Sequence, residues 1–113
     1  MTKLVFYDEQ NDILSIHNGF TKDEKFKGNI DVGELVLDVS SRGRIRGIEI
    51  MNATKFLKEF DLRKEILKDI VDANFNASIR PNSIILTISI KAKNIENEIP
   101  AKIAVPMETP SYG

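Results

Sequence analysis

The chain has 113 residues, of which 16 are lysine or arginine and 17 are aspartate or glutamate, and it contains no cysteine. Without cysteine there is no disulfide framework, no thiolate nucleophile and no cysteine-ligated metal site. The formal charge of −1 argues against a nucleic-acid-binding protein, because such proteins usually carry a clear basic excess. The length is ordinary for one domain, so residues 1–113 are predicted to form a single domain.

The sequence also indicates where in the cell the protein is located. Charged residues follow Met1 within the first eight positions, before an apolar signal-peptide core could form. Polar residues interrupt every apolar run well short of the length of a membrane span. We therefore expect a cytoplasmic protein with no membrane partner.

Two β-hairpins are predicted in the first half of the chain. In the first, Leu4 to Tyr7 and Ile13 to His17 are rich in branched and aromatic residues and flank a polar turn. In the second, Glu34 to Val39 and Arg44 to Met51 flank Ser41-Arg42-Gly43, whose glycine supplies the positive φ that a tight turn requires.

Strict pairing of the second hairpin would scatter its apolar side chains over both faces of the sheet. If Gly47 is the extra residue of a β-bulge, the alternation of side chains between the two faces shifts by one residue. The apolar side chains then share one face. Asp38 and Arg46 would then meet across the strands on the opposite face. The residues predicted for the apolar face are Leu35, Leu37, Val39, Ile45, Ile48 and Ile50.

A helical region is predicted next, within an amphipathic stretch from Lys55 to Ala73. Leu62, Ile66 and Ile70 are spaced by four residues, which favours a helix over Leu62 to Val71 with one stripe facing the core.

Two strands are predicted to follow the helical region. Apolar residues alternate with others from Ile84 to Ile90 and from Ile99 to Val105, and Pro100 indicates that the last strand lies at a sheet edge. Residues 107–113 are predicted to be a loose tail. The fold class expected is therefore α+β: a single antiparallel or mixed sheet, made of two N-terminal hairpins and the C-terminal strands, with one or two helices on one face.

The order of motifs in the first half resembles that of a known family. A tyrosine-aspartate hairpin precedes a strand that ends in aspartate, a glycine turn, and a glycine-isoleucine-glutamate-isoleucine stretch running into a helix. The residues concerned are Tyr7, Asp8, Asp12, Leu14, Gly33 through Asp38, Gly43, Gly47 through Ile50, and Ala53. Residues 3–57 thus resemble the YuzE-like proteins of unknown function, and residues 58–106 would be a C-terminal extension. The resemblance implies a small prokaryotic α+β domain without established catalytic activity, and an antitoxin-like or partner-binding role for some members.

Four carboxylates lie within these motifs, namely Asp8, Asp12, Asp38 and Glu49. Gathered together they could bind Mg²⁺ or Ca²⁺ or act as an acid–base pair, which makes a divalent-cation-dependent hydrolase or nuclease-like enzyme an alternative function. The spacing of Asp8 and Asp12 instead fits turn stabilisation, because aspartate side chains accept hydrogen bonds from nearby backbone N–H groups. We favour turn stabilisation and expect no metal or other cofactor.

His17 and three arginines are the remaining candidates for chemistry. His17 is the only histidine and could be a general base, but its place beside Asn18-Gly19 favours an exposed surface residue. A basic cluster could contact a polyanion, which gives a weak nucleic-acid-binding module as a further alternative; a solvated hairpin tip is the favoured interpretation. The cluster consists of Arg42, Arg44 and Arg46.

The leading functional hypothesis is a non-enzymatic interaction module. It would be a homodimer, or an antitoxin-like partner of another small protein. The sequence shows no catalytic constellation, which argues against an enzyme. It does contain an apolar strand that a second chain could cover, which favours association. The residues expected at that interface are Ile84, Leu86, Ile88 and Ile90.

Overall fold

The computed structural model describes residues 3–107, which form eight β-strands and three short helices. The strands are β1 (Leu4–Asp8), β2 (Ile13–His17), β3 (Phe26–Val32), β4 (Leu35–Ser40), β5 (Ile45–Ile50), β6 (Ile70–Ile79), β7 (Ser83–Ala92) and β8 (Ile99–Pro106). The helices are α1 (Ala53–Phe56), the 3₁₀-helix η1 (Lys58–Phe60) and α2 (Lys64–Leu67).

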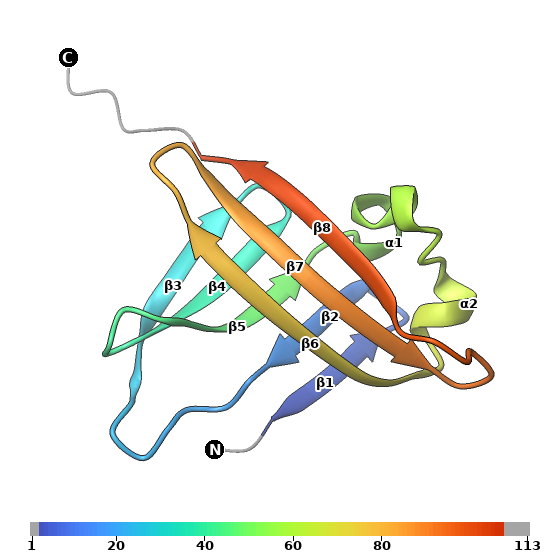
Figure 1. Ribbon diagram of the computed structural model, residues 1–113, viewed down its shortest axis with the longest axis horizontal. Coiled ribbons are helices and arrows are strands. Elements are labelled where there is room, and N and C mark those ends of the chain that lie inside the picture. The colour runs from blue at the N-terminus through green and yellow to red at the C-terminus, as the bar shows by residue number, and fades with distance from the viewer. Residues whose placement is uncertain (1–2, 108–113) are drawn as a thin grey trace.

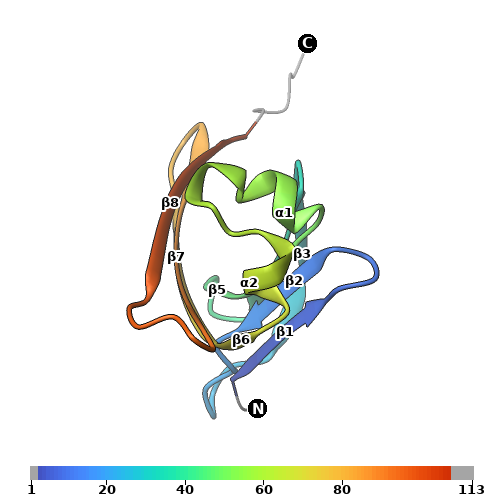
Figure 2. The same ribbon diagram turned by 90° about the vertical axis from the view of Figure 1, so that its right-hand side faces the viewer.

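The strands form two antiparallel sheets. One has five strands in the order β1-β2-β5-β4-β3, and the other has three in the order β6-β7-β8. The three long strands run diagonally across the five-stranded sheet (Figure 1). Figure 2 shows α1 and α2 between the two sheets, where they close one end of the sandwich.

A single core fills the space between the sheets. Strand side chains alternate between two faces, so each sheet contributes every second residue to that core. Leucines 57, 62 and 67 from the helical connection are fully buried with them. The fully buried strand residues are Leu14, Leu35, Leu37, Ile50, Ile84, Leu86, Ile88 and Ile90.

The predicted α+β class with one sheet is wrong: the protein is mostly β, with two sheets and only very short helices. The predicted helix over Leu62 to Val71 is reduced to α2, and β6 begins at Ile70. The spacing of Leu62 and Ile66 satisfied a helical pattern, but the next segment alternates in a period of two. Ala73 and Phe75 are buried, whereas Asn74 and Asn76 are exposed.

Tertiary pairing explains why strand prevails over helix from Ile70 onward. A short isolated helix is marginal in water, whereas β6 forms a long antiparallel ladder with β7. That ladder also buries Phe75 opposite Ile88 on the core face. The apolar strands predicted after residue 83 are confirmed as β7 and β8, and β8 is at a sheet edge, as Pro100 indicated.

The predicted bulge in the second hairpin is confirmed with one correction. Val39 pairs with Ile45 and Leu37 with Ile48, so the phase shifts between them. Asp38 lies opposite Gly47, which leaves Arg46 rather than Gly47 as the residue without a partner in β4. The predicted Asp38–Arg46 pair is therefore not formed, although the apolar residues share one face as expected.

None of the helices in residues 3–107 has the length and apolarity needed to cross a membrane.

Replacing Leu62 with alanine is expected to lower the free energy of unfolding by about 2–5 kcal/mol, because its side chain is fully buried in the shared core. Urea denaturation followed by circular dichroism would measure this. Val71→Ala is the matched control, since Val71 is 51% exposed and its truncation should cost well under about 1 kcal/mol. Equal losses for the two variants would contradict the core described above.

Candidate functional site

The outer face of the five-stranded sheet presents both polar and apolar side chains. The three-stranded sheet and the helices all lie on the opposite side of this sheet (Figure 2). Among the paired positions that point outward there are four carboxylates but no lysine or arginine. These outward residues are Leu4, Phe6, Asp8, Ile13, Ser15, His17, Phe26, Asn29, Asp31, Val36, Asp38, Ser40, Gly47 and Glu49. We call this set the acidic face.

A shallow pocket of about 360 Å³ occupies the β1–β2–β5–β4 part of the acidic face. Leu4 and Phe6 form its apolar rim and are 53% and 56% exposed. Its polar lining is Ser15, His17, Asp38 and Glu49. The pocket therefore combines two exposed apolar side chains with two carboxylates.

His17 is buried at one end of this pocket, contrary to the exposed position predicted for it. The ring of Phe20 packs edge-on against the imidazole, with 4.9 Å between ring centroids. The backbone N–H of Gly19 donates to His17 Nδ1 over 2.9 Å. In the neutral imidazole the proton is then on Nε2, which faces Asp38 Oδ2 at 3.8 Å.

This arrangement does not suit general-base catalysis. A base needs an acceptor nitrogen within reach of a substrate proton, and Nδ1 of His17 already accepts from Gly19. The Nε2–Oδ2 separation of 3.8 Å is too long for a hydrogen bond. His17 and Asp38 thus form a polar pair at the floor of the acidic face.

Gly47 makes room for that pair. A Cβ atom at this position would lie 2.4 Å from Cδ2 of His17 and 2.7 Å from Oδ2 of Asp38. His17 on β2 and Asp38 on β4 both lie opposite Gly47 on the intervening strand β5, and their side chains extend over its backbone. Glycine is therefore required at position 47, because the side chains of His17 and Asp38 leave no room for a Cβ atom.

Asp8 and Asp12 stabilise the β1–β2 turn, as their spacing predicted. Asp8 accepts from the backbone and side-chain nitrogens of Asn11 at 3.1 and 2.8 Å, and these bonds lower its pKa. Asp12 accepts from the Tyr7 hydroxyl at 2.6 Å and from Thr54 Oγ1 at 2.6 Å. Burial acts to raise the pKa of Asp12, but the hydrogen bonds from Thr54 and Tyr7 hold it below 3.8. The carboxylate therefore links the turn to α1.

The four predicted carboxylates do not meet at one site. Asp8 is bonded to Asn11 at the turn end of the acidic face and Asp12 is bonded to Thr54, whereas Asp38 and Glu49 line the pocket of the acidic face. Among residues 3–107, no three acidic or histidine side chains are grouped closely enough to hold a metal ion.

Two of the three predicted arginines converge on a residue that the sequence analysis missed, Glu24. Its side chain is fully buried and receives two hydrogen bonds of 2.8 Å from Arg44. Ser40 Oγ donates to it at 2.6 Å, and Arg46 Nε lies 3.6 Å away. The bonds from Arg44 hold the pKa of Glu24 far below its usual value of 4.5. A lone acidic residue in a polar loop gives no sequence signal of this kind, because Ser40 and Arg44 are 16 and 20 positions away.

Arg42 stays exposed at the hairpin tip. The strand residues predicted for an interface, Ile84, Leu86, Ile88 and Ile90, are completely buried in the core and face the five-stranded sheet.

Comparisons with known proteins relate the chain to proteins of unknown function. Residues 4–53 match a family described as "Protein of unknown function (DUF2283)". An uncharacterized protein of Methanocaldococcus jannaschii is 30% identical over 87 residues, which cover 75% of this chain and 67% of that relative. No solved structure matches the chain at a significant level.

Gly47→Ala is expected to lower the free energy of unfolding by about 1–3 kcal/mol, because the added methyl group collides with His17 and Asp38. Thermal and urea denaturation would measure the loss. Gly28→Ala is the control, since nothing lies within 4 Å of a Cβ placed there. A cost for Gly47→Ala no larger than that of Gly28→Ala would show that the pair does not cover the bulge.

The network at Glu24 predicts a specific loss of stability in acid. Because its pKa in the folded state lies below 4.5, the folded protein binds fewer protons in acid than the unfolded chain does. The free energy of unfolding should therefore fall as the pH drops below about 4.5. In urea titrations at about pH 6 and about pH 3, Glu24→Gln should show a smaller fall than wild type. The exposed-site variant Glu59→Gln should retain the wild-type fall, and an unaltered fall in Glu24→Gln would refute the assignment.

Proposed function

Because the chain belongs to the DUF2283 family, whose function is unknown, we propose its role from geometry: a non-enzymatic, cytoplasmic module that binds a basic partner protein through the acidic face. The observation that carries this proposal is that neither the second sheet nor the helices cover the acidic face, which presents the exposed apolar side chains of Leu4 and Phe6 together with acidic ones.

The apolar part of the face supplies affinity. Phe6 and Leu4 are large side chains held at more than half exposure by a rigid strand, and they stand beside a pocket of about 360 Å³. Aromatic residues with a neighbouring depression are the usual centres of protein interfaces. Burial of both side chains by a partner would remove them from water at little cost in backbone order.

The charged part of the face selects the partner. Asp8, Asp31, Asp38 and Glu49 point outward, and no basic residue at a paired position of the five strands points with them. A lysine or arginine of the partner could lie between Asp38 and Glu49 at the pocket. Charge complementarity of this kind raises association rates and rejects acidic partners.

A second copy of the chain fits this surface less well. Two copies related by a two-fold axis would bring carboxylates opposite carboxylates, which is repulsive. A small basic partner also agrees with the antitoxin-like role that the YuzE-like resemblance implies for residues 3–57. The occupant proposed is therefore a different protein with a basic surface.

A fluorescein-labelled peptide of alternating leucine and lysine serves as the probe of this chemistry, with binding followed by fluorescence anisotropy. The full chain should bind it, and Phe6→Ser should weaken binding by about tenfold or more, since a central aromatic residue is removed. Ile79→Ser is the matched control, because Ile79 is 53% exposed but lies on the other sheet, in β6. Glu49→Gln should weaken binding at low salt, with less effect at high salt.

Three results would contradict the proposal. They are equal loss in Phe6→Ser and Ile79→Ser, equal binding of a leucine–glutamate peptide, or a dimer in light scattering that Phe6→Ser converts to monomer. The last result would assign the acidic face to a second copy of the chain.

A further inference from the structure

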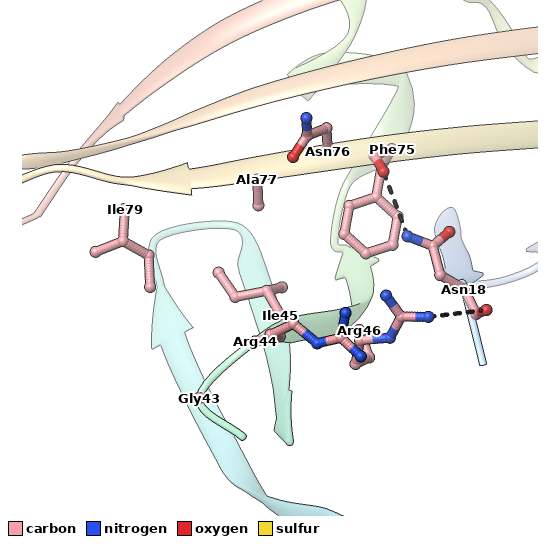
Figure 3. A pocket seen from close by; sticks show the side chains of 9 residues that line it. All are labelled: Asn18, Gly43, Arg44, Ile45, Arg46, Phe75, Asn76, Ala77 and Ile79. Atoms are coloured by element: carbon pink, nitrogen blue, oxygen red, sulfur yellow. Dashed lines mark hydrogen bonds between the residues drawn. The ribbon is translucent and has the colours of Figure 1, made fainter. Parts of the chain in front are cut away.

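A second pocket, of about 380 Å³, lies between the start of β5 and the second half of β6. It shares no lining residue with the pocket of the acidic face. Figure 3 shows Phe75, Ala77 and Ile79 pointing from β6 toward β5, with Ile45 facing them. Arg44, Arg46 and Asn18 line the polar side.

The guanidinium of Arg46 lies at the polar side of this pocket. Its Nε donates to the carbonyl oxygen of Gly19 at 2.7 Å, and its Nη2 donates to that of Asn18 at 3.4 Å. Carbonyl oxygens orient the group but carry no formal charge. The side chain is only 20% exposed, so its charge is partly withdrawn from water.

Glu24 does not neutralise both arginines. It lies within 4 Å of Arg44 and Arg46, and it is the only carboxylate of residues 3–107 that pairs with either of them. Its oxygens already accept from Arg44, Ser40 and Thr21, which occupies the acceptor positions of a carboxylate. Two guanidinium groups and one carboxylate leave one net positive charge at the pocket.

The remaining N–H groups of Arg46 stay within reach of a ligand. Nη1 of Arg46 donates to no group of the described chain, and no fully buried side-chain nitrogen there lacks a hydrogen-bond partner, so Nη1 is in contact with solvent. Guanidinium groups bind carboxylates through paired hydrogen bonds, more strongly than they bind neutral acceptors.

The opposite side of the pocket is apolar. Ile79 is 53% exposed, Ile45 and Ala77 are partly buried, and the ring of Phe75 faces inward (Figure 3). A bare inorganic anion would leave these side chains in water, whereas a carboxylate with a short hydrocarbon group would cover them. The volume is at the lower end of the range for small-ligand sites.

We infer that the pocket between β5 and β6 binds a small organic monocarboxylate, with its carboxylate on Arg46 and its hydrocarbon group against Ile45, Ala77 and Ile79. The net charge of the arginine–glutamate cluster matches one anion, and the apolar wall matches a short chain. This inference does not depend on the proposed function, because the two pockets lie on different surfaces.

Hexanoate is the probe, titrated into the full-length ¹⁵N-labelled protein and followed by amide chemical shifts. Saturable shifts are expected at residues of the pocket and not on the acidic face. The isosteric neutral amide, hexanamide, should bind about tenfold or more weakly, because it cannot supply the anion. Inorganic phosphate should also bind more weakly, since it leaves the apolar wall exposed.

Two variants locate the interactions, each with its spectrum recorded first to establish that it is folded. Arg46→Gln should weaken hexanoate binding about tenfold or more, whereas Arg42→Gln, at the exposed hairpin tip, should not. Ile79→Ser should weaken hexanoate binding and leave phosphate binding unchanged.

The inference is overturned by any of four results: no saturable shifts in wild type, equal binding of hexanoate and hexanamide, hexanoate binding in folded Arg46→Gln equal to wild type, or shifts confined to the acidic face. Phosphate binding equal to hexanoate binding would also overturn it, because the site would then be a general anion site. The wild-type titration alone decides the matter if Arg46→Gln does not fold.

Discussion

The extra residue in β5 determines what every part of the five-stranded sheet faces. With Arg46 unpaired, Ile45, Ile48 and Ile50 all point into the core despite their odd spacing. The same irregularity leaves the backbone of Gly47 bare beneath His17 and Asp38. Arg46 has no partner in β4, and its guanidinium donates to the carbonyl oxygens of Asn18 and Gly19. The core, the acidic face and the pocket between β5 and β6 thus all depend on one bulge, which shifts the alternation of side chains in β5 by one residue.

The two surfaces differ in how far their carboxylates are exposed to solvent. On the acidic face the carboxylates of Asp38 and Glu49 remain open to solvent, so an incoming charge finds them without rearrangement. At the other pocket, Glu24 is enclosed and rigid, held by Arg44 and Ser40. Its role is to fix the positions of two guanidinium groups while cancelling only one charge. The exposed carboxylates thus suit the proposed macromolecular partner, and the enclosed cluster suits the proposed small anion.

Local patterns predicted β1, β2, β4, β5, β7, β8 and the bulge, because alternation and a glycine in an apolar hairpin leave few arrangements open. They did not predict β3, whose residues are mostly exposed. They failed at residues 62–79, where Leu62, Ile66 and Ile70 fitted a helix and only pairing with β7 made Ile70 the start of a strand. That segment accounts for the helix that was wrongly predicted. The single sheet was also wrong, because the division of the strands into two sheets is set by pairing between distant parts of the chain. The site was predicted only in part: Asp8 and Asp12 were correctly assigned to a turn, but the Arg44–Glu24 contact joins distant parts of the chain. No local pattern encodes a contact of that kind.

The segment matched to the family, residues 4–53, ends in the middle of the structural unit rather than at its border. Its inner face contains Leu14, Leu35 and Ile50, which are fully inaccessible here because β6, β7, β8 and the helical leucines cover them. The residues matched by the family model therefore share their core with residues outside the match. A family member that ends near residue 60 would need another cover for this apolar sheet, supplied by different residues or by a second polypeptide. Within such a family, quaternary structure would vary with the segment that is joined to the C-terminal end of the shared half.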